Sequence, residues 1–231
     1  MIKKKLKEKN VPITKAWDWS KNTDKKWLTP CIESAYLSER WKSKGFKELL
    51  DLGCGLGRHT IYMGTHGFHV TAYDLSDEAV RQTRKWAVKE NIQIQASTGN
   101  MLNLPFQDNS FDCLIAYNVI YHTNTEGFKA TLREIQRILR PNGEFFLTLI
   151  SKSTYSFIHA DKSQRIDKNT ILRSEQETGD NIPHLFVDLE DIKLFFKDFE
   201  FICPPEEDFV YQIENPQWYS VHWKIIARNK L

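Results

Sequence analysis

The sequence has few cysteines and no long hydrophobic run. Its 231 residues include 4 cysteines without paired spacing, and this pattern gives no indication of a disulfide framework. Spanning a bilayer takes about 20 consecutive apolar residues, and no such segment occurs. The 7 histidines lack the paired spacings of zinc sites, so we expect no metal ion. These absences are typical of a cytoplasmic protein without a membrane partner.

Neither sign of charge dominates the chain. It has 32 Lys and Arg residues against 30 Asp and Glu residues, for a net charge of +2. Because nucleic-acid binding usually requires a basic surface, we expect no nucleic-acid partner and take a small molecule as the default ligand. With 41% hydrophobic residues, a chain of this length can bury a full core in one domain. The composition does not indicate an oligomeric state.

Three glycines at alternate positions follow a short apolar run. Residues 47–59 read KELLDLGCGLGRH. The glycines are Gly53, Gly55 and Gly57. Glycine permits positive φ and lets a ligand approach the backbone, and the residues from Arg58 to His66 can form a helix. The pattern therefore predicts a strand, a ligand-binding turn and a helix. A dinucleotide fingerprint would have its third glycine where Arg58 stands, so the spacing fits a pyrophosphate poorly.

A second strand is predicted over His69–Tyr73, and it ends at Asp74. This acid follows the glycine turn by about twenty residues, the spacing at which a carboxylate accepts hydrogen bonds from ribose hydroxyls. It favours a ribose-bearing ligand without distinguishing NAD from others.

Strands and helices are predicted to alternate along the rest of the chain. Further strands are expected over 92–97, 111–117, 144–150, 199–203 and 218–228, with a helix after Ser76, one before Leu139 and one over 189–199. Alternation of this kind indicates a largely parallel, doubly wound α/β sheet. Ligands of such sheets bind beyond the carboxyl ends of the strands.

Several of these segments resemble one enzyme family. The run from Asp51 to Gly57 resembles motif I of the class I S-adenosylmethionine-dependent methyltransferases, and Gly99–Phe106 resembles their adenine-binding segment. The turn Leu139–Gly143 and the closing strand are also similar to that family. The resemblance implies a Rossmann-like sheet of seven strands, mostly parallel with an antiparallel last strand and helices on both faces. It also implies methyl transfer from S-adenosylmethionine to a small-molecule acceptor by in-line displacement, with S-adenosylhomocysteine as product.

The resemblance assigns residues to the cofactor. The glycine turn would lie against its amino-acid half with Asp51 meeting the amine, Asp74 would bind the ribose, and Asn100 would stand where most members have an aspartate for the adenine amine. His122 and Tyr121 are the candidates for a catalytic base, needed only if the acceptor loses a proton; the alternative is that they line the pocket or pack. The predicted cofactor-binding residues are Asp51, Gly53, Cys54, Gly55, Gly57, Asp74, Leu75, Asn100, Met101, Tyr117, Asn118 and His122.

Two segments are expected to flank or interrupt the methyltransferase domain, which is predicted over 47–231. Residues 1–46 form an aromatic-rich, helical extension that contains four of the 7 tryptophans. We expect these to pack on the sheet's helices, or alternatively to form a lid over the methionyl end of the cofactor or a wall of the acceptor site. Residues 151–185 form either a cap over the acceptor pocket or a surface insertion. The four tryptophans are Trp17, Trp19, Trp27 and Trp41.

Two other functions stay open from the sequence. One is a protein that binds S-adenosylmethionine or S-adenosylhomocysteine without turnover, in a regulatory or partner role. The other is an NAD-dependent or nucleotide-sugar enzyme on a similar sheet, which Arg58 disfavours. Methylation of nucleic-acid bases is also disfavoured, because residues 117–120 read YNVI and lack the Pro-Pro of base-amine enzymes.

Overall fold

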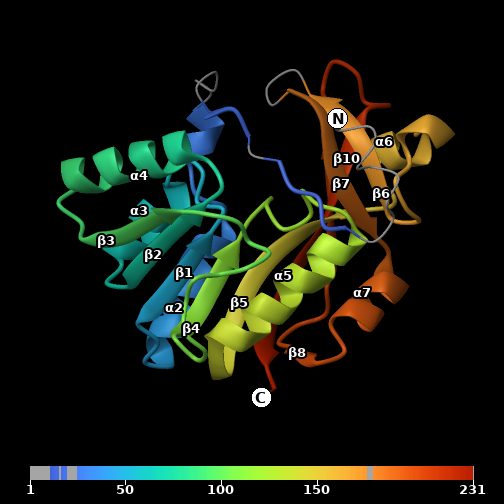
Figure 1. The fold of residues 1–231 in the computed structure, drawn as a ribbon. Coiled ribbons are helices and arrows are strands. Elements are labelled where there is room, and N and C mark those ends of the chain that lie inside the picture. Colours follow the sequence, from blue (N-terminus) through green and yellow to red (C-terminus); the bar gives the residue numbers. More distant parts are fainter. Residues whose placement is uncertain (1–10, 16, 20–24, 176–178, 231) are drawn as a thin grey trace.

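The computed structural model describes residues 11–15, 17–19, 25–175 and 179–230. Its centre is a mixed sheet with the strand path β3-β2-β1-β4-β5-β10-β8 (Figure 1). These strands are β1 (Glu48–Leu52), β2 (His69–Asp74), β3 (Ile94–Thr98), β4 (Phe111–Ala116), β5 (Leu139–Ser151), β8 (Phe199–Phe201) and β10 (Tyr219–Asn229). Strands β1 to β5 pair in parallel, whereas β10 is antiparallel to β5 and to β8. The predicted doubly wound fold with an antiparallel last strand is confirmed.

Three further strands extend the predicted set of seven, so the sheet has ten strands in the described part of the chain. They are β6 (Thr170–Glu175), β7 (Gly179–Val187) and β9 (Glu206–Tyr211). Strands β6 and β7 form an antiparallel pair within the segment 151–185, in which the sequence showed no clear periodicity. The pair is stable because Ile171, Leu185 and Phe186 are buried against the main core. Strand β7 also joins β5 in parallel at Ile150.

Helices cover both faces of the sheet. They are α2 (Glu33–Ser43), α3 (Arg58–Thr65), α4 (Asp77–Lys89), α5 (Thr125–Ile138), α6 (Tyr155–Ile158) and α7 (Leu189–Phe195), with 3-10 turns η2 (Lys25–Leu28) and η3 (Lys162–Gln164). The Ser76 hydroxyl accepts from the Ala79 N–H and caps α4 as predicted. The Asn124 amide oxygen caps α5 in the same way.

The two faces divide the core because successive strand residues point to opposite sides. Leu50 and Leu114 pack in the larger core with α5 and α7, whereas their neighbours Leu49 and Ile115 pack in the smaller core with α2 and α3. Figure 1 shows α5 lying across the near face of β4 and β5.

Two strand boundaries differ from the prediction. Strand β3 begins at Ile94 rather than at 92, because Asn91 has a φ of 55° and turns the chain out of α4. Ile92 therefore packs near Gly64 instead of pairing in the sheet. Strand β5 begins at Leu139 and includes the turn before 144, where Asn142 adopts the expected left-handed conformation with a φ of 62°.

A buried carboxylate attaches the N-terminal extension to the sheet. The Glu144 side chain on β5 has 0% exposure and pairs with Arg40 at 2.8 Å and with Lys44 at 2.9 Å. The Trp41 indole N–H donates to the same carboxylate at 3.0 Å. Because Leu37 and Trp41 of α2 are fully buried, this helix is part of the core.

We expect Glu144→Ala to lower the free energy of unfolding by about 3 kcal/mol, since it leaves one buried indole N–H and two cations without their acceptor. Denaturant unfolding checks this value. Glu39→Ala on α2 is the matched control, because its ion pair with Lys42 is exposed and should contribute little to stability. Equal effects of the two substitutions would contradict the anchoring role.

Candidate functional site

A pocket of about 950 Å³, its open mouth included, lies at the carboxyl ends of β1, β2 and β4. Its wall combines the glycine turn, the ends of the neighbouring strands and five N-terminal residues: Thr14, Lys15, Trp17, Trp19 and Trp27. The predicted site residues that line it are Gly53, Cys54, Gly55, Asp74, Leu75, Asn100, Met101, Tyr117, Asn118, Tyr121 and His122. Asp51 and Gly57 are not among the lining residues.

The glycine turn needs glycine for two separate reasons. Gly53, Gly55 and Gly57 have φ values of 71°, 53° and 97°, in the left-handed region that other residues disfavour. In addition, a Cβ on Gly53 would lie 2.3 Å from a methyl carbon of Val119. The turn is therefore fixed both by its backbone conformation and by the close contact with Val119.

We expect Gly53→Ala to destabilise the fold by more than 2 kcal/mol, because it adds a steric clash to the cost of a left-handed conformation. Gly67→Ala is the matched control: Gly67 also has a positive φ, of 90°, but a Cβ there meets nothing within 4 Å. The control should cost only about 1 kcal/mol. Denaturant unfolding of both variants measures the difference, and similar losses would mean that the contact with Val119 is unimportant.

Asp74 connects the glycine turn to the end of β2. One carboxylate oxygen accepts from the Gly55 N–H at 2.9 Å and the other accepts from the Ser76 N–H at 2.9 Å. Burial raises the pKa of the Asp74 carboxyl, and the backbone N–H bonds oppose that rise. The carboxylate lines the pocket where the predicted ribose contact requires an acceptor.

Asn100 contacts the N-terminal segment as well as its own loop. Its amide oxygen accepts from the Leu102 N–H at 3.0 Å, and its amide nitrogen donates to the Thr14 hydroxyl at 2.9 Å. Asn100 therefore joins its loop to the N-terminal segment, while a second lone pair on the amide oxygen leaves capacity for a ligand amine.

Asp51 and Gly57 contact the helices next to the glycine turn rather than the pocket. The Thr60 hydroxyl donates to the Asp51 carboxylate at 2.6 Å, and burial raises the pKa of this carboxyl to about 6. Gly57 precedes α3 and lies close to Thr83, whose hydroxyl donates to the carbonyl oxygen of Gly55. The ligand contacts expected for these two residues stay predictions.

Tyr121 and His122 lie in a group of buried rings at one side of the pocket. The His122 ring centroid is 4.5 Å from that of Tyr121 and 4.8 Å from that of His184 on β7. Burial lowers the pKa of His122 well below its usual value, and it lowers that of His222 to about 4. His122 is therefore neutral near pH 7, which is the form that accepts a proton.

The cysteines carry no sign of reactivity. Cys54 is buried in the turn with its thiol 3.7 Å from the Thr83 hydroxyl, and burial raises its pKa well above the usual value. Cys113 is fully buried within β4. Both behave as small core residues. Within the described ranges, no group of three or more His, Cys, Asp or Glu residues could hold a metal ion.

Several lining residues were not assigned to the cofactor from the sequence. Of the four N-terminal tryptophans, Trp41 packs in the core, whereas Trp17, Trp19 and Trp27 line the pocket. The density of tryptophans before the first strand was the signal for this arrangement. Arg58 stands where a dinucleotide fingerprint would have its third glycine, and it begins α3. Its side chain also lines the pocket.

Comparisons with known proteins agree with this architecture. Residues 49–143 match the family model described as a methyltransferase domain. A solved S-adenosylmethionine-dependent methyltransferase from Methanosarcina mazei superposes with a TM-score of 0.68 at 19% identity, covering 80% of this chain and 93% of the other. Residues 49–143 are thus similar to a methyltransferase domain, and the chain has the fold of that solved enzyme. A Burkholderia thailandensis 1,6-didemethyltoxoflavin-N1-methyltransferase, solved with bound S-adenosylhomocysteine, superposes with a TM-score of 0.61 at 17% identity, covering 87% and 79% of the two chains.

Relatives in sequence carry several methyltransferase names. An uncharacterised methyltransferase of Bacillus subtilis, YodH, is 28% identical over 74% of this chain and 73% of its own length. A sterol 24-C-methyltransferase of Schizosaccharomyces pombe is 26% identical over 80% of this chain. The chain spans only 47% of the length of that sterol enzyme, and only 49% and 38% of the lengths of two further relatives. In the described part of the chain, no helix has the length and apolar character needed to cross a membrane.

Proposed function

We propose that the protein transfers a methyl group from S-adenosylmethionine to a small-molecule acceptor and releases S-adenosylhomocysteine. The main observation in support is that the glycine turn, Asp74 and Asn100 line one pocket at the carboxyl ends of adjacent strands. The cradle fits such a ligand, because the glycine turn adjoins the Asp74 carboxylate in the wall of the pocket. The S-adenosylhomocysteine in the Burkholderia relative supports the same cofactor.

In this proposal each part of the pocket binds one part of the cofactor. The glycine turn faces the amino-acid half, Asp74 accepts from the ribose hydroxyls, and Asn100 with Met101 borders the adenine. Relatives in sequence include a sterol 24-C-methyltransferase and a ubiquinone biosynthesis O-methyltransferase, and we propose a small molecule as the acceptor here.

The chemistry requires little of the protein beyond alignment. A sulfonium is an activated leaving group, so an acceptor held in line with the methyl carbon displaces it directly. Correct positioning of two reactants can lower a barrier by about 7 kcal/mol or more. A base is needed only when the acceptor carries a proton that must leave, and neutral His122 beside Tyr121 supplies one.

Asp74→Asn should weaken S-adenosylhomocysteine binding at least about tenfold, since one amide oxygen replaces two carboxylate acceptors that also order the turn. Titration calorimetry with S-adenosylmethionine, S-adenosylhomocysteine and NAD measures this. Asp77→Asn is the matched control, because Asp77 is exposed at the start of α4. Binding of NAD in preference to both sulfur compounds would overturn the proposed function.

The titration and a methyl-transfer assay together distinguish an enzyme from a protein that only binds the cofactor. Binding of both sulfur compounds, followed by release of S-adenosylhomocysteine in the presence of an acceptor panel, supports the enzyme. Binding without methyl transfer to any acceptor in the panel favours a regulatory protein that has lost turnover.

For an acceptor that loses a proton, His122→Gln should lower the rate of methyl transfer by about 10²-fold or more while changing S-adenosylhomocysteine affinity less than threefold. Because the neutral imidazole is the active form, the wild-type rate should fall as the pH decreases through the depressed pKa of His122. The pH–rate profile of both proteins checks this, and an unchanged rate in the variant would restrict His122 to lining the pocket.

A further inference from the structure

The loop after β4 contains an asparagine with an unusual backbone conformation. Asn118 has a φ of 60°, in the left-handed region. Of the four non-glycine residues with positive φ in the described structure, it is the one that lines the pocket. Strained conformations of this kind persist where surrounding contacts enforce them, and they are concentrated at functional sites. The conformation therefore directs attention to what the Asn118 side chain does in the pocket.

The Thr148 hydroxyl on β5 holds Asn118 at two points. It accepts from the Asn118 backbone N–H at 2.8 Å and donates to the side-chain oxygen Oδ1 at 2.8 Å. Thr148 is buried, so both bonds are shielded from water. Because Oδ1 is bonded to Thr148, the amide nitrogen Nδ2 faces away from this hydroxyl.

Three polar groups of the same loop are open to the pocket. They are the Tyr117 hydroxyl, Asn118 Nδ2 and the ring nitrogens of His122, and all three residues line the pocket. Within the described ranges these groups have no hydrogen-bond partner, and they are not among the buried polar atoms without a partner. Each is therefore accessible to a ligand.

A contact with the glycine turn fixes the position of this loop. A Cβ on Gly53 would lie 2.3 Å from a methyl carbon of Val119, so Val119 packs directly on the backbone of the turn. In the proposed function the turn faces the amino-acid half of the cofactor, which ends at the sulfonium. Asn118, which directly precedes Val119, is then next to the methyl group that is transferred.

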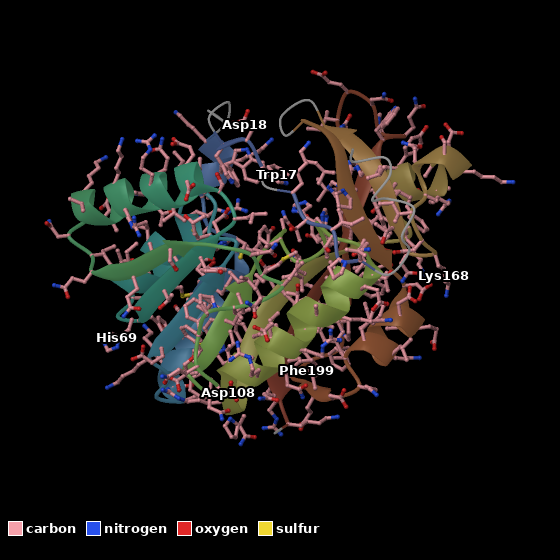
Figure 2. The ribbon with its side chains drawn as sticks, in the orientation of Figure 1. Trp17, Asp18, His69, Asp108, Lys168 and Phe199 are labelled. Carbon is pink, nitrogen blue, oxygen red and sulfur yellow. The ribbon has the colours of Figure 1, made fainter. Side chains whose placement is uncertain are left out.

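Aromatic rings form the wall on the His122 side. The His122 ring centroid lies 5.3 Å from that of Trp17 and 4.5 Å from that of Tyr121. Figure 2 shows Trp17 above the ends of the strands, between α4 and the β7–β10 strands. Since aromatic side chains pack well against other flat rings, this wall favours a planar acceptor.

The charges of the pocket disfavour a cationic acceptor. Asp74 is the one acidic residue among the described residues that line the pocket, and its carboxylate binds the Gly55 N–H of the glycine turn. Near the loop after β4 the nearby charge is positive, because the Arg58 guanidinium lies 5.0 Å from the Tyr117 ring centroid. An ammonium group placed there would have no carboxylate to pair with.

We propose that the methyl acceptor is a hydroxyl group on a planar ring, as in a phenol, and that its oxygen accepts a hydrogen bond from Asn118 Nδ2. The amide nitrogen only donates, so it recognises an oxygen lone pair, whereas an ammonium has none and sulfur accepts weakly. Thr148 is a positioning residue that orients this amide. The inference rests on the proposed function and deepens it, and it assigns Asn118, which the sequence predicts to bind the cofactor, to the acceptor.

The residues of the loop then divide the work of the transfer. The hydroxyl oxygen forms the new bond to the methyl carbon, and the electron pair of the broken carbon–sulfur bond stays on sulfur. The hydroxyl proton passes to a ring nitrogen of His122, which becomes an imidazolium. Asn118 Nδ2 orients the oxygen for in-line attack, since its own position is fixed by Thr148.

Acceptors that differ in one feature test the class. Phenol and naphthol are compared with aniline and thiophenol, which replace the oxygen, and with cyclohexanol, which has a non-planar ring. The release of S-adenosylhomocysteine by the full chain measures the rate. We expect kcat/KM for the two hydroxylated aromatic rings to be at least about tenfold above that for the other three compounds, because a site that bonds a hydroxyl rejects analogues without one.

Two matched glycine substitutions test Asn118. Asn118→Gly removes the amide but keeps the backbone, because glycine adopts a φ of 60° without strain. It should lower kcat/KM for phenol about tenfold or more, while S-adenosylhomocysteine affinity in calorimetry changes less than about twofold. Asn142→Gly is the control, since Asn142 has a φ of 62° in an exposed turn, and it should leave both quantities unchanged.

Two substitutions of Thr148 test its positioning role. Thr148→Val removes the hydroxyl and should lower kcat/KM for phenol about tenfold, because the Asn118 amide loses its fixed orientation. Thr148→Ser retains the hydroxyl and should restore most of the loss. A role in packing alone predicts the opposite order, because valine keeps the shape of the threonine side chain and serine does not.

The outcomes separate this proposal from the proposed function. Faster transfer to aniline, thiophenol or cyclohexanol than to both hydroxylated aromatic rings would overturn the acceptor class, as would no transfer to any of the five compounds by a chain that binds S-adenosylhomocysteine. Weakened S-adenosylhomocysteine binding in Asn118→Gly with an unchanged preference for phenol would return Asn118 to the cofactor. If the wild-type chain does not bind S-adenosylhomocysteine, the proposed function itself fails.

Discussion

The bond between the Gly55 N–H and the Asp74 carboxylate is the interaction on which the site depends. It joins the turn after β1 to the end of β2, while the Thr83 hydroxyl on α4 holds the carbonyl oxygen of the same glycine. Three elements of the sheet and its helices thus fix one tight turn at the switch point of the fold. The positive φ values of the turn are tolerated because these bonds and the chain at Val119 determine its conformation together.

The N-terminal segment is built into the same site by contacts at both ends. The buried Glu144 holds α2 against β5, and the Asn124 side chain binds the backbone of Val11 and Ile13 at the start of α5. Between these anchors, Asn100 binds Thr14 and the tryptophans line the pocket. A segment held in this way can shape ligand binding without being part of the sheet.

The inserted segment 151–185 packs against two residues of the pocket wall, Tyr121 and His122. Its strand β7 joins the chain near the site, because the Leu185 N–H donates to the Tyr121 carbonyl oxygen at 2.8 Å. This pairing brings the His184 ring against His122. Burial keeps the neighbouring imidazoles of His122 and His222 neutral near pH 7. The arrangement is compatible with a cap over the acceptor, which stays a prediction.

The sequence by itself determined the parallel sheet, its helices and the residues near the glycine turn. These features depend on local signals, which are strand and helix periodicity, glycines that need positive φ, and an N-cap such as Ser76. It did not place β6 and β7, whose stability comes from long-range burial of Ile171 and Phe186 rather than from a local pattern. It also left open which tryptophans pack and which line the pocket. Tertiary structure decided that point, because the position of an aromatic side chain depends on distant partners. Trp41 donates to the buried carboxylate of Glu144 more than one hundred residues away, whereas Trp27 contacts Arg58 and Trp19 lies over Gly55.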